Sequence, residues 1–214
     1  MTVRVVVVDD NQLLRAGLVT VLDSDEELDV VGEADDGPAG VKLALEQLPD
    51  VVLMDVEMPG GDGVTATKRL GSEAPTVRVL ILTMFDLDDY VLEALRAGAS
   101  GFLLKTTEPR ALIDAVKACA AGETKLAPSV IDRLVDTYVS RPAVPAAGVG
   151  DLTDRELDVL RSMAKGLSNA EIAGELYLAE TTVRTPVARI LNKLGVRDRV
   201  QAVVVAHRSG LATG

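Results

Sequence analysis

The sequence predicts an α/β fold with a doubly wound parallel five-stranded sheet, followed by a separate all-α domain. Over residues 1–122, five short runs rich in Val, Leu and Ile alternate with five segments whose apolar residues recur at helical spacing. Strands that alternate with helices in this way form a parallel sheet covered on both faces. Residues 151–214 show only helical signals, so we expect four helices there.

The expected strands are apolar along most of their length, which is typical of strands buried on both faces. They cover residues 3–8, 28–34, 51–54, 77–82 and 101–104. The expected helices between and after them cover 11–22, 38–48, 63–70, 86–97 and 108–121. Gly98 and Gly122 follow the last two helices and are expected to end them.

Composition divides the chain into a domain over 1–122, a linker over 123–150 and a domain over 151–214. The linker should contain a helix at about 127–139, followed by a flexible stretch with two Pro and two Gly and no charge after Arg141. The four helices expected after it cover about 154–165, 169–177, 180–194 and 198–209. Two segments have capping-box spacing, namely Thr153 with Glu156 and Ser168 with Glu171.

Charge is unevenly distributed along the chain, whose formal net charge is −11. The excess of acidic residues lies in 1–122, whereas 151–214 is close to neutral, so only the second domain is suited to bind nucleic acid. No apolar stretch is long enough for a membrane span and no secretory signal is seen, which predicts a cytoplasmic protein. Cys119 is the one cysteine and is expected to be a small buried apolar residue.

Functional side chains follow four of the five expected strands. Asp9 and Asp10 follow the first strand, Asp55 the third, Thr83 the fourth and Lys105 the fifth. Taken singly, each position is more often a turn residue, a helix cap or a solvated surface group. Because the carboxyl ends of parallel strands share one edge of the sheet, the ordered set predicts a single site there.

The chemistry of that site follows from its charges. Three carboxylates crowded together require a counter-charge, and a hard divalent cation, most simply Mg²⁺, takes oxygen ligands of this kind. Asp55 could then act as a nucleophile toward a phosphoryl group and form an acyl phosphate. Lys105 would supply a positive charge and Thr83 a hydroxyl donor to the bound phosphate.

The first domain resembles the receiver domain of two-component response regulators over residues 3–122. The matching segments are 7–11, 53–60, 81–83 and 98–105. The resemblance implies a flavodoxin-like strand order of 2-1-3-4-5 and phosphorylation of Asp55 by a sensor histidine kinase. It implies Mg²⁺ ligation by Asp9, Asp10, Asp55 and the backbone carbonyl of Glu57. It also implies a switch pair of Thr83 and Phe102, with a plain core aromatic as the less favoured reading of Phe102.

The helix expected at 180–194 has one apolar and one polar face. Its apolar stripe is Val183, Val187, Ile190, Leu191 and Leu194. The other face presents Thr181, Thr182, Arg184, Thr185, Arg189, Asn192 and Lys193. Cations and short hydroxyls can reach phosphates and base edges of DNA, but an ordinary solvated helix face would look similar.

The second domain is similar to the LuxR-type helix-turn-helix over about 151–212. The matching segments are 152–160, 166–173 and 194–199, and with the receiver they make the whole chain similar to the NarL/FixJ family of transcription regulators. The resemblance implies that the third helix of this domain enters the major groove of double-stranded DNA. The DNA contacts would come from Thr181, Thr182, Arg184, Thr185, Arg189 and Lys193, and the fourth helix would pair two chains as a homodimer.

Two positions depart from the helix-turn-helix pattern. Ala179 stands where the family has a Ser that caps the recognition helix, and a lost cap costs about 1 kcal/mol. Pro186 stands where the family usually has His. A proline inside a helix costs about 3 kcal/mol or more, so we expect a kink there, or a helix that restarts with Thr185 as its cap.

The sequence therefore predicts a response regulator that accepts a phosphoryl group on Asp55 and regulates transcription by binding DNA. Enzymatic activity should be limited to self-phosphotransfer and slow self-dephosphorylation. One alternative is a phosphate-responsive protein whose second domain binds another protein, an idea motivated only by Pro186. Another is a phosphatase of the haloacid-dehalogenase type, but such enzymes need a second Asp two residues after the nucleophile, where this chain has Glu57.

Overall fold

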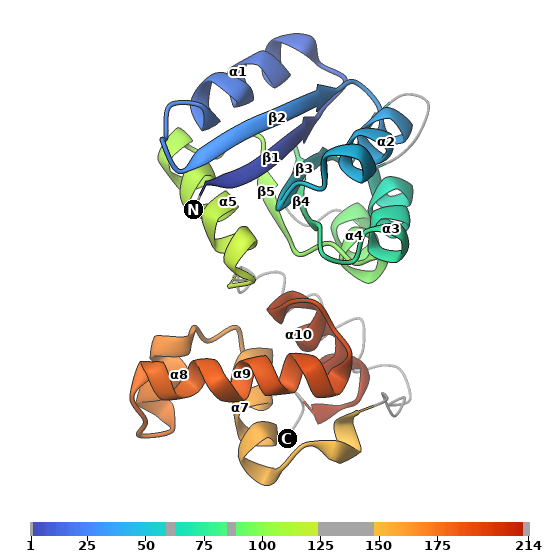
Figure 1. The fold of residues 1–214 in the computed structure, drawn as a ribbon. Helices are drawn as coiled ribbons and strands as arrows, with labels where there is room; N and C mark the ends of the chain where they lie inside the picture. Colours follow the sequence, from blue (N-terminus) through green and yellow to red (C-terminus); the bar gives the residue numbers. More distant parts are fainter. Residues whose placement is uncertain (1, 59–62, 85–88, 124–147, 212–214) are drawn as a thin grey trace. The chain divides into compact units, whose positions relative to one another are not determined.

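The computed structural model describes residues 2–58, 63–84, 89–123 and 148–211. The chain forms two compact units, residues 1–124 and 125–214 (Figure 1). The linker helix expected at about 127–139 lies outside the described residues. Within the described ranges, no helix is long and apolar enough to cross a membrane.

The first unit is built on a five-stranded parallel sheet. Its strands are β1 (Val3–Val8), β2 (Leu28–Ala34), β3 (Val51–Asp55), β4 (Arg78–Thr83) and β5 (Gly101–Leu104). Their order across the sheet is β2-β1-β3-β4-β5 and all neighbours are parallel, which confirms the predicted topology. Strands β3 and β4 each extend one residue beyond the prediction, so Asp55 and Thr83 are the last residues of their strands.

Helices cover both faces of this sheet (Figure 1). They are α1 (Gln12–Leu22), α2 (Gly37–Gln47), α3 (Gly63–Glu73), α4 (Asp89–Ala97) and α5 (Pro109–Ala121). The apolar core on the α1 and α5 face includes Leu18 and Leu22, alternate residues of β1 and β3, and Cys119, which is buried as expected. On the other face, α2 packs so closely on β1 that a β-carbon at Gly40 would lie 2.7 Å from a methyl carbon of Val8.

The second unit is helical. After the short 3-10 helix η1 (Val149–Asp151) come α7 (Asp154–Ala164), α8 (Asn169–Glu175), α9 (Glu180–Leu194) and α10 (Arg199–Arg208). Helix α7 packs against α8, α9 and α10, and α8 also contacts α9 (Figure 1). Both predicted capping boxes are confirmed, because Thr153 and Ser168 each exchange hydrogen bonds with the Glu three residues later.

Helix α9 continues through Pro186 without a break, so the predicted restart at Thr185 is wrong. The missing N–H of Pro186 removes one bond to the carbonyl of Thr182. Buried residues on either side of the proline, Val183 and Ile190, anchor both halves of the helix in the core, and this packing offsets the lost bond. Ala179 makes no side-chain cap, as expected. A kink at Pro186 stays a prediction.

Candidate functional site

Three carboxylates meet at the carboxyl edge of the sheet. Asp9 directly follows β1, Asp10 comes next, and Asp55 ends β3. One oxygen from each of the three lies within 4.8 Å of the others. Asp9 and Asp55 are almost completely buried, whereas Asp10 is exposed and faces solvent. The sequence predicted that these residues meet, and they do meet, because the carboxyl ends of parallel strands lie at one edge of the sheet.

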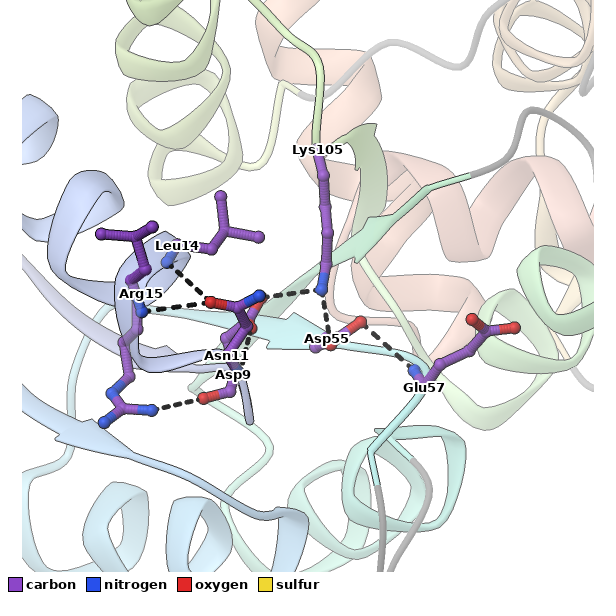
Figure 2. A network of polar contacts seen from close by, with 8 residues as sticks. Asp9, Asn11, Leu14, Arg15, Asp55, Glu57 and Lys105 are labelled. Carbon is purple, nitrogen blue, oxygen red and sulfur yellow. Dashed lines mark hydrogen bonds and ion pairs between the residues drawn. The ribbon is translucent and has the colours of Figure 1, made fainter.

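Lys105, one residue after β5, provides the counter-charge for the two buried carboxylates. Its Nζ lies 2.6 Å from Oδ2 of Asp55 and 2.9 Å from Oδ2 of Asp9 (Figure 2). Burial raises the pKa of Asp55 above its usual value, although the Lys105 ammonium opposes that rise. Burial also tends to lower the pKa of Lys105, but its contacts with Asp55 and Asp9 outweigh this and raise the pKa. The lysine therefore stays charged at neutral pH.

Backbone and side-chain donors fix the orientation of the carboxylates (Figure 2). The N–H of Asn11 donates to Oδ1 of Asp9 at 2.9 Å, and the N–H of Glu57 donates to Oδ1 of Asp55 at 3.2 Å. Arg15 on α1 donates to the backbone carbonyl of Asp9 at 2.6 Å and pairs with Glu33 of β2. Sequence reasoning missed Arg15, because a cation on a helix carries no sign of which strand end it reaches.

Gly63, the first residue of α3, was also missed. Its N–H donates to the carbonyl of Val56 at 3.1 Å, so α3 starts directly beneath the end of β3. A β-carbon at this position would lie 2.0 Å from the backbone oxygen of Asp55. The end of β3 therefore occupies its place only because residue 63 has no side chain.

The donor set fits a hard divalent cation such as Mg²⁺. Oδ2 of Asp9 is buried and, within the described chain, its close partner is the Lys105 ammonium at 2.9 Å, with no neutral donor beside it. Hard cations of this class prefer carboxylate and carbonyl oxygens. The three aspartates supply carboxylates, and Glu57, whose side chain is exposed, could add a backbone carbonyl.

The two remaining receiver residues predicted from sequence also lie near this edge. Thr83 is the last residue of β4 and is buried, with 5% of its surface exposed. Phe102 lies in β5 directly beside Ile81 of β4 and is only half-buried. The role of Phe102 as a switch residue stays a prediction.

In the second unit, the polar face of α9 is exposed. Thr182, Arg184, Thr185 and Arg189 are exposed there, and Thr181 is the second residue of the helix. Of the predicted apolar stripe, Val183, Ile190 and Leu194 are buried, while Val187 and Leu191 are half-buried. The two faces of α9 are thus divided as the sequence predicted.

Lys193 has a different role from its neighbours on α9. Its Nζ lies 2.6 Å from Oε2 of Glu156 at the start of α7 and 2.9 Å from the carbonyl of Asp151 in η1. Gly148, just before η1, has a φ of +83°, and a β-carbon there would lie 1.9 Å from the carbonyl oxygen of Lys193. The Lys193 ammonium is thus held by two partners at the surface of the unit, where it joins the last turn of α9 to the first turn of α7.

Comparisons with known proteins follow the same division of the chain. Residues 5–117 match the family model for the response regulator receiver domain, and residues 151–206 match the model for bacterial regulatory proteins of the luxR family. The chain belongs to the response regulator family. Its receiver is joined to a LuxR-type helix-turn-helix, so this response regulator acts as a DNA-binding transcription regulator and not as a typical catalytic enzyme.

Relatives of this response regulator match it over nearly the whole chain. It is 43% identical to the uncharacterized transcriptional regulatory protein YxjL of Bacillus subtilis, over 98% of this chain and 97% of that protein. It is 41% identical to the transcriptional regulatory protein LiaR of Bacillus subtilis, over 98% and 99%. The crystal structure of the response regulator ChrA of a heme-sensing two-component system is similar with a TM-score of 0.53, at 39% identity over 98% of each chain.

A pH prediction for this response regulator follows from Glu156. The hydrogen bond from Lys193, assisted by the backbone and hydroxyl of Thr153, lowers the pKa of Glu156 to about 2. A depressed carboxyl pKa stabilises the fold above the unfolded pKa near 4.5, and that stability is lost as the pH falls toward about 2. Glu156→Gln should therefore lower stability at pH 7, and stability measured by urea titration should then depend less on pH in the acid range.

Glu171→Gln, in the exposed second capping box, is the matched control and should have a smaller effect. Equal acid dependence of Glu156→Gln and the unmodified protein would contradict the assignment.

Proposed function

We propose that this response regulator carries its phosphoryl group on Asp55, receives it from a sensor histidine kinase, and thereby controls how α9 binds DNA. The observation that supports this most is the convergence of Asp9, Asp10 and Asp55 with Lys105 at one sheet edge. A lone buried aspartate would be a structural residue. An aspartate with two further carboxylates and a shared ammonium has the groups needed for phosphoryl transfer.

In the transfer step, a carboxylate oxygen of Asp55 attacks phosphorus. The bond between phosphorus and the nitrogen of the kinase phosphohistidine breaks as the new P–O bond forms, and the imidazole leaves. The Lys105 ammonium already lies 2.6 Å from the Asp55 carboxylate and can follow the negative charge onto the phosphoryl oxygens. Mg²⁺, held by Asp9, Asp10, Asp55 and the Glu57 carbonyl, would supply further neutralisation of that charge.

Thr83 and Phe102 would respond to phosphorylation of Asp55. Thr83 would donate its hydroxyl to the new phosphate, and Phe102 would change its packing in β5, which shifts the receiver between two states. We place the receiver at 1–122, the linker at 123–150 and the DNA-binding domain at 151–214. The active form would be a homodimer in the cytoplasm, paired through α10, that reads two half-sites.

The DNA contacts proposed on α9 are Thr181, Thr182, Arg184, Thr185 and Arg189. Lys193 is left out, because its ammonium is bound to Glu156 and Asp151. Lys193 would act on DNA binding only by holding α9 in position. The two kinds of cation on one helix can be told apart by the salt dependence of binding.

Arg189→Gln should weaken binding to any duplex and reduce the slope of log affinity against log salt by about 0.9, because one phosphate contact is lost. Lys193→Met should weaken binding without changing that slope, and it should lower stability. Fluorescence anisotropy between about 50 and 200 mM salt measures both effects. If Lys193→Met also reduces the slope of log affinity against log salt, Lys193 contacts a DNA phosphate directly.

The proposed function is tested with acetyl phosphate and Mg²⁺ as phosphoryl donor. Intact-protein mass spectrometry should show the gain of one phosphoryl group, with peptide mapping to Asp55. Selection of bound fragments from genomic DNA, with and without the donor, should then recover sites whose occupancy depends on it. If binding to DNA does not depend on salt concentration, a protein partner for the second domain is favoured. If the protein rapidly hydrolyses small phosphate esters, a phosphatase is favoured.

A further inference from the structure

We propose that Tyr177, in the turn between α8 and α9, is a DNA-backbone contact that donates its hydroxyl to a phosphate, with Arg155 beside it as a second backbone contact. The proposal rests on the DNA-binding function of the second unit. It adds to that function a contact from the turn, which the α9 surface does not include.

The first observation is exposure. The Tyr177 side chain is 96% exposed, in a chain with only three Tyr and two Phe. Aromatic rings normally contribute to folding by burying their large apolar area. A ring in water contributes almost nothing of this kind, so packing within the unit does not explain the residue.

The second observation is backbone conformation. Tyr177 has a φ of +53°, in the left-handed region where a side chain is unfavourable and Gly or Asn is preferred. Among the residues that the structure describes, only Leu48 shares this property, with a φ of +47°. An exposed tyrosine in a conformation better suited to glycine opposes folding, and residues of this kind are most often kept for function.

The third observation is position. Tyr177 lies two residues after the end of α8 and three before the start of α9. In a helix-turn-helix, the second helix enters the major groove with its N-terminal end while the first helix crosses the phosphate backbone. The turn between them therefore runs beside the phosphates, and tyrosine hydroxyls are among the groups that bind phosphate oxygens.

Arg155 brings a positive charge to the same place. The side chain comes from α7, and its Nη2 donates to the carbonyl of Leu176 at 3.1 Å, directly before Tyr177. Arg155 is exposed. Because a guanidinium carries five N–H groups, the bond that braces the turn leaves it able to bind a phosphate as well. The turn thus presents a hydroxyl and a cation together.

The test uses full-length Tyr177→Phe and Tyr177→Gly with Leu48→Gly as the matched control. Binding is measured by anisotropy on a mixed-sequence duplex of about three helical turns, and stability by thermal unfolding. Tyr177→Phe should bind about threefold to tenfold more weakly, with the salt slope unchanged because the lost donor is neutral. Tyr177→Gly should lose at least as much affinity while its unfolding midpoint stays the same or rises. Leu48→Gly should keep or raise the midpoint with no loss of affinity.

Each outcome separates this proposal from the function on which it rests. If the unmodified protein does not bind the duplex at all, the DNA-binding function fails. If it binds and both Tyr177 variants bind equally well, the tyrosine contact is refuted and the function stands. A drop in the unfolding midpoint of Tyr177→Gly would show a structural role instead. A change in oligomeric state with unchanged duplex affinity would show that Tyr177 faces another protein.

Discussion

Replacing Asp55 with asparagine is expected to abolish phosphoryl uptake from acetyl phosphate, and with it every donor-dependent change in DNA binding. The amide has no anionic oxygen to attack phosphorus, while its size and its remaining carbonyl preserve the contact with Lys105. The fold should not suffer. Burial raises the pKa of Asp55, so its ionised form opposes folding at neutral pH, and a neutral side chain removes that penalty.

Intact-protein mass spectrometry measures the loss of phosphoryl uptake, and thermal unfolding measures whether stability is kept. The matched control is Asp114→Asn on α5, which changes an exposed carboxylate whose nearest ion partner is Arg110. That variant should take up phosphate like the unmodified protein. Undiminished uptake by Asp55→Asn would remove Asp55 as the phosphoacceptor, even if the uptake mapped to Asp9 or Asp10.

Gly63→Ala is expected to disrupt the receiver through a steric clash with the backbone at the end of β3. A β-carbon would stand 2.0 Å from the backbone oxygen of Asp55, and backbone atoms cannot yield as the end of a flexible side chain can. Overpacking of this kind costs about 3 kcal/mol. Because the strand end that moves is the one that carries Asp55, phosphoryl uptake should fall together with stability.

Gly17→Ala on α1 is the control for this change. Apart from the neighbouring backbone of α1 itself, nothing lies within 4 Å of a β-carbon at position 17, so alanine should stabilise the helix by about 0.5–1 kcal/mol and leave uptake unchanged. Chemical denaturation gives the free energies of unfolding for both variants. A Gly63→Ala protein as stable as the unmodified chain would mean that α3 can shift away from β3.

The sequence was sufficient for the strand order and for the meeting of Asp9, Asp55 and Lys105. Both follow from one rule, that parallel strands joined by helices end at the same edge. The capping boxes at Thr153 and Ser168 were equally predictable, because their chemistry is complete within four residues. Local signals of this kind do not depend on how distant segments pack.

Contacts between distant segments were not predictable in the same way. Lys193 occupies the polar face of α9, and nothing in that helix indicates that its ammonium reaches Glu156 on α7. The proximity of Gly63 to Asp55 likewise depends on where α3 starts relative to β3. The continuity of α9 through Pro186 was missed because helix propensity ignores the buried residues, Val183 and Ile190, that hold the two halves in place.

The close fit of Gly148 against the carbonyl of Lys193 has a mechanical consequence. Gly148 is the first residue described in the second unit, and the Lys193 ammonium binds the carbonyl of Asp151 three residues later. The backbone from Gly148 to Asp151 is thus held by the final turn of α9 before α7 begins. A backbone shift at Gly148 would therefore act on the end of α9 directly, without first passing through the remainder of the helical core.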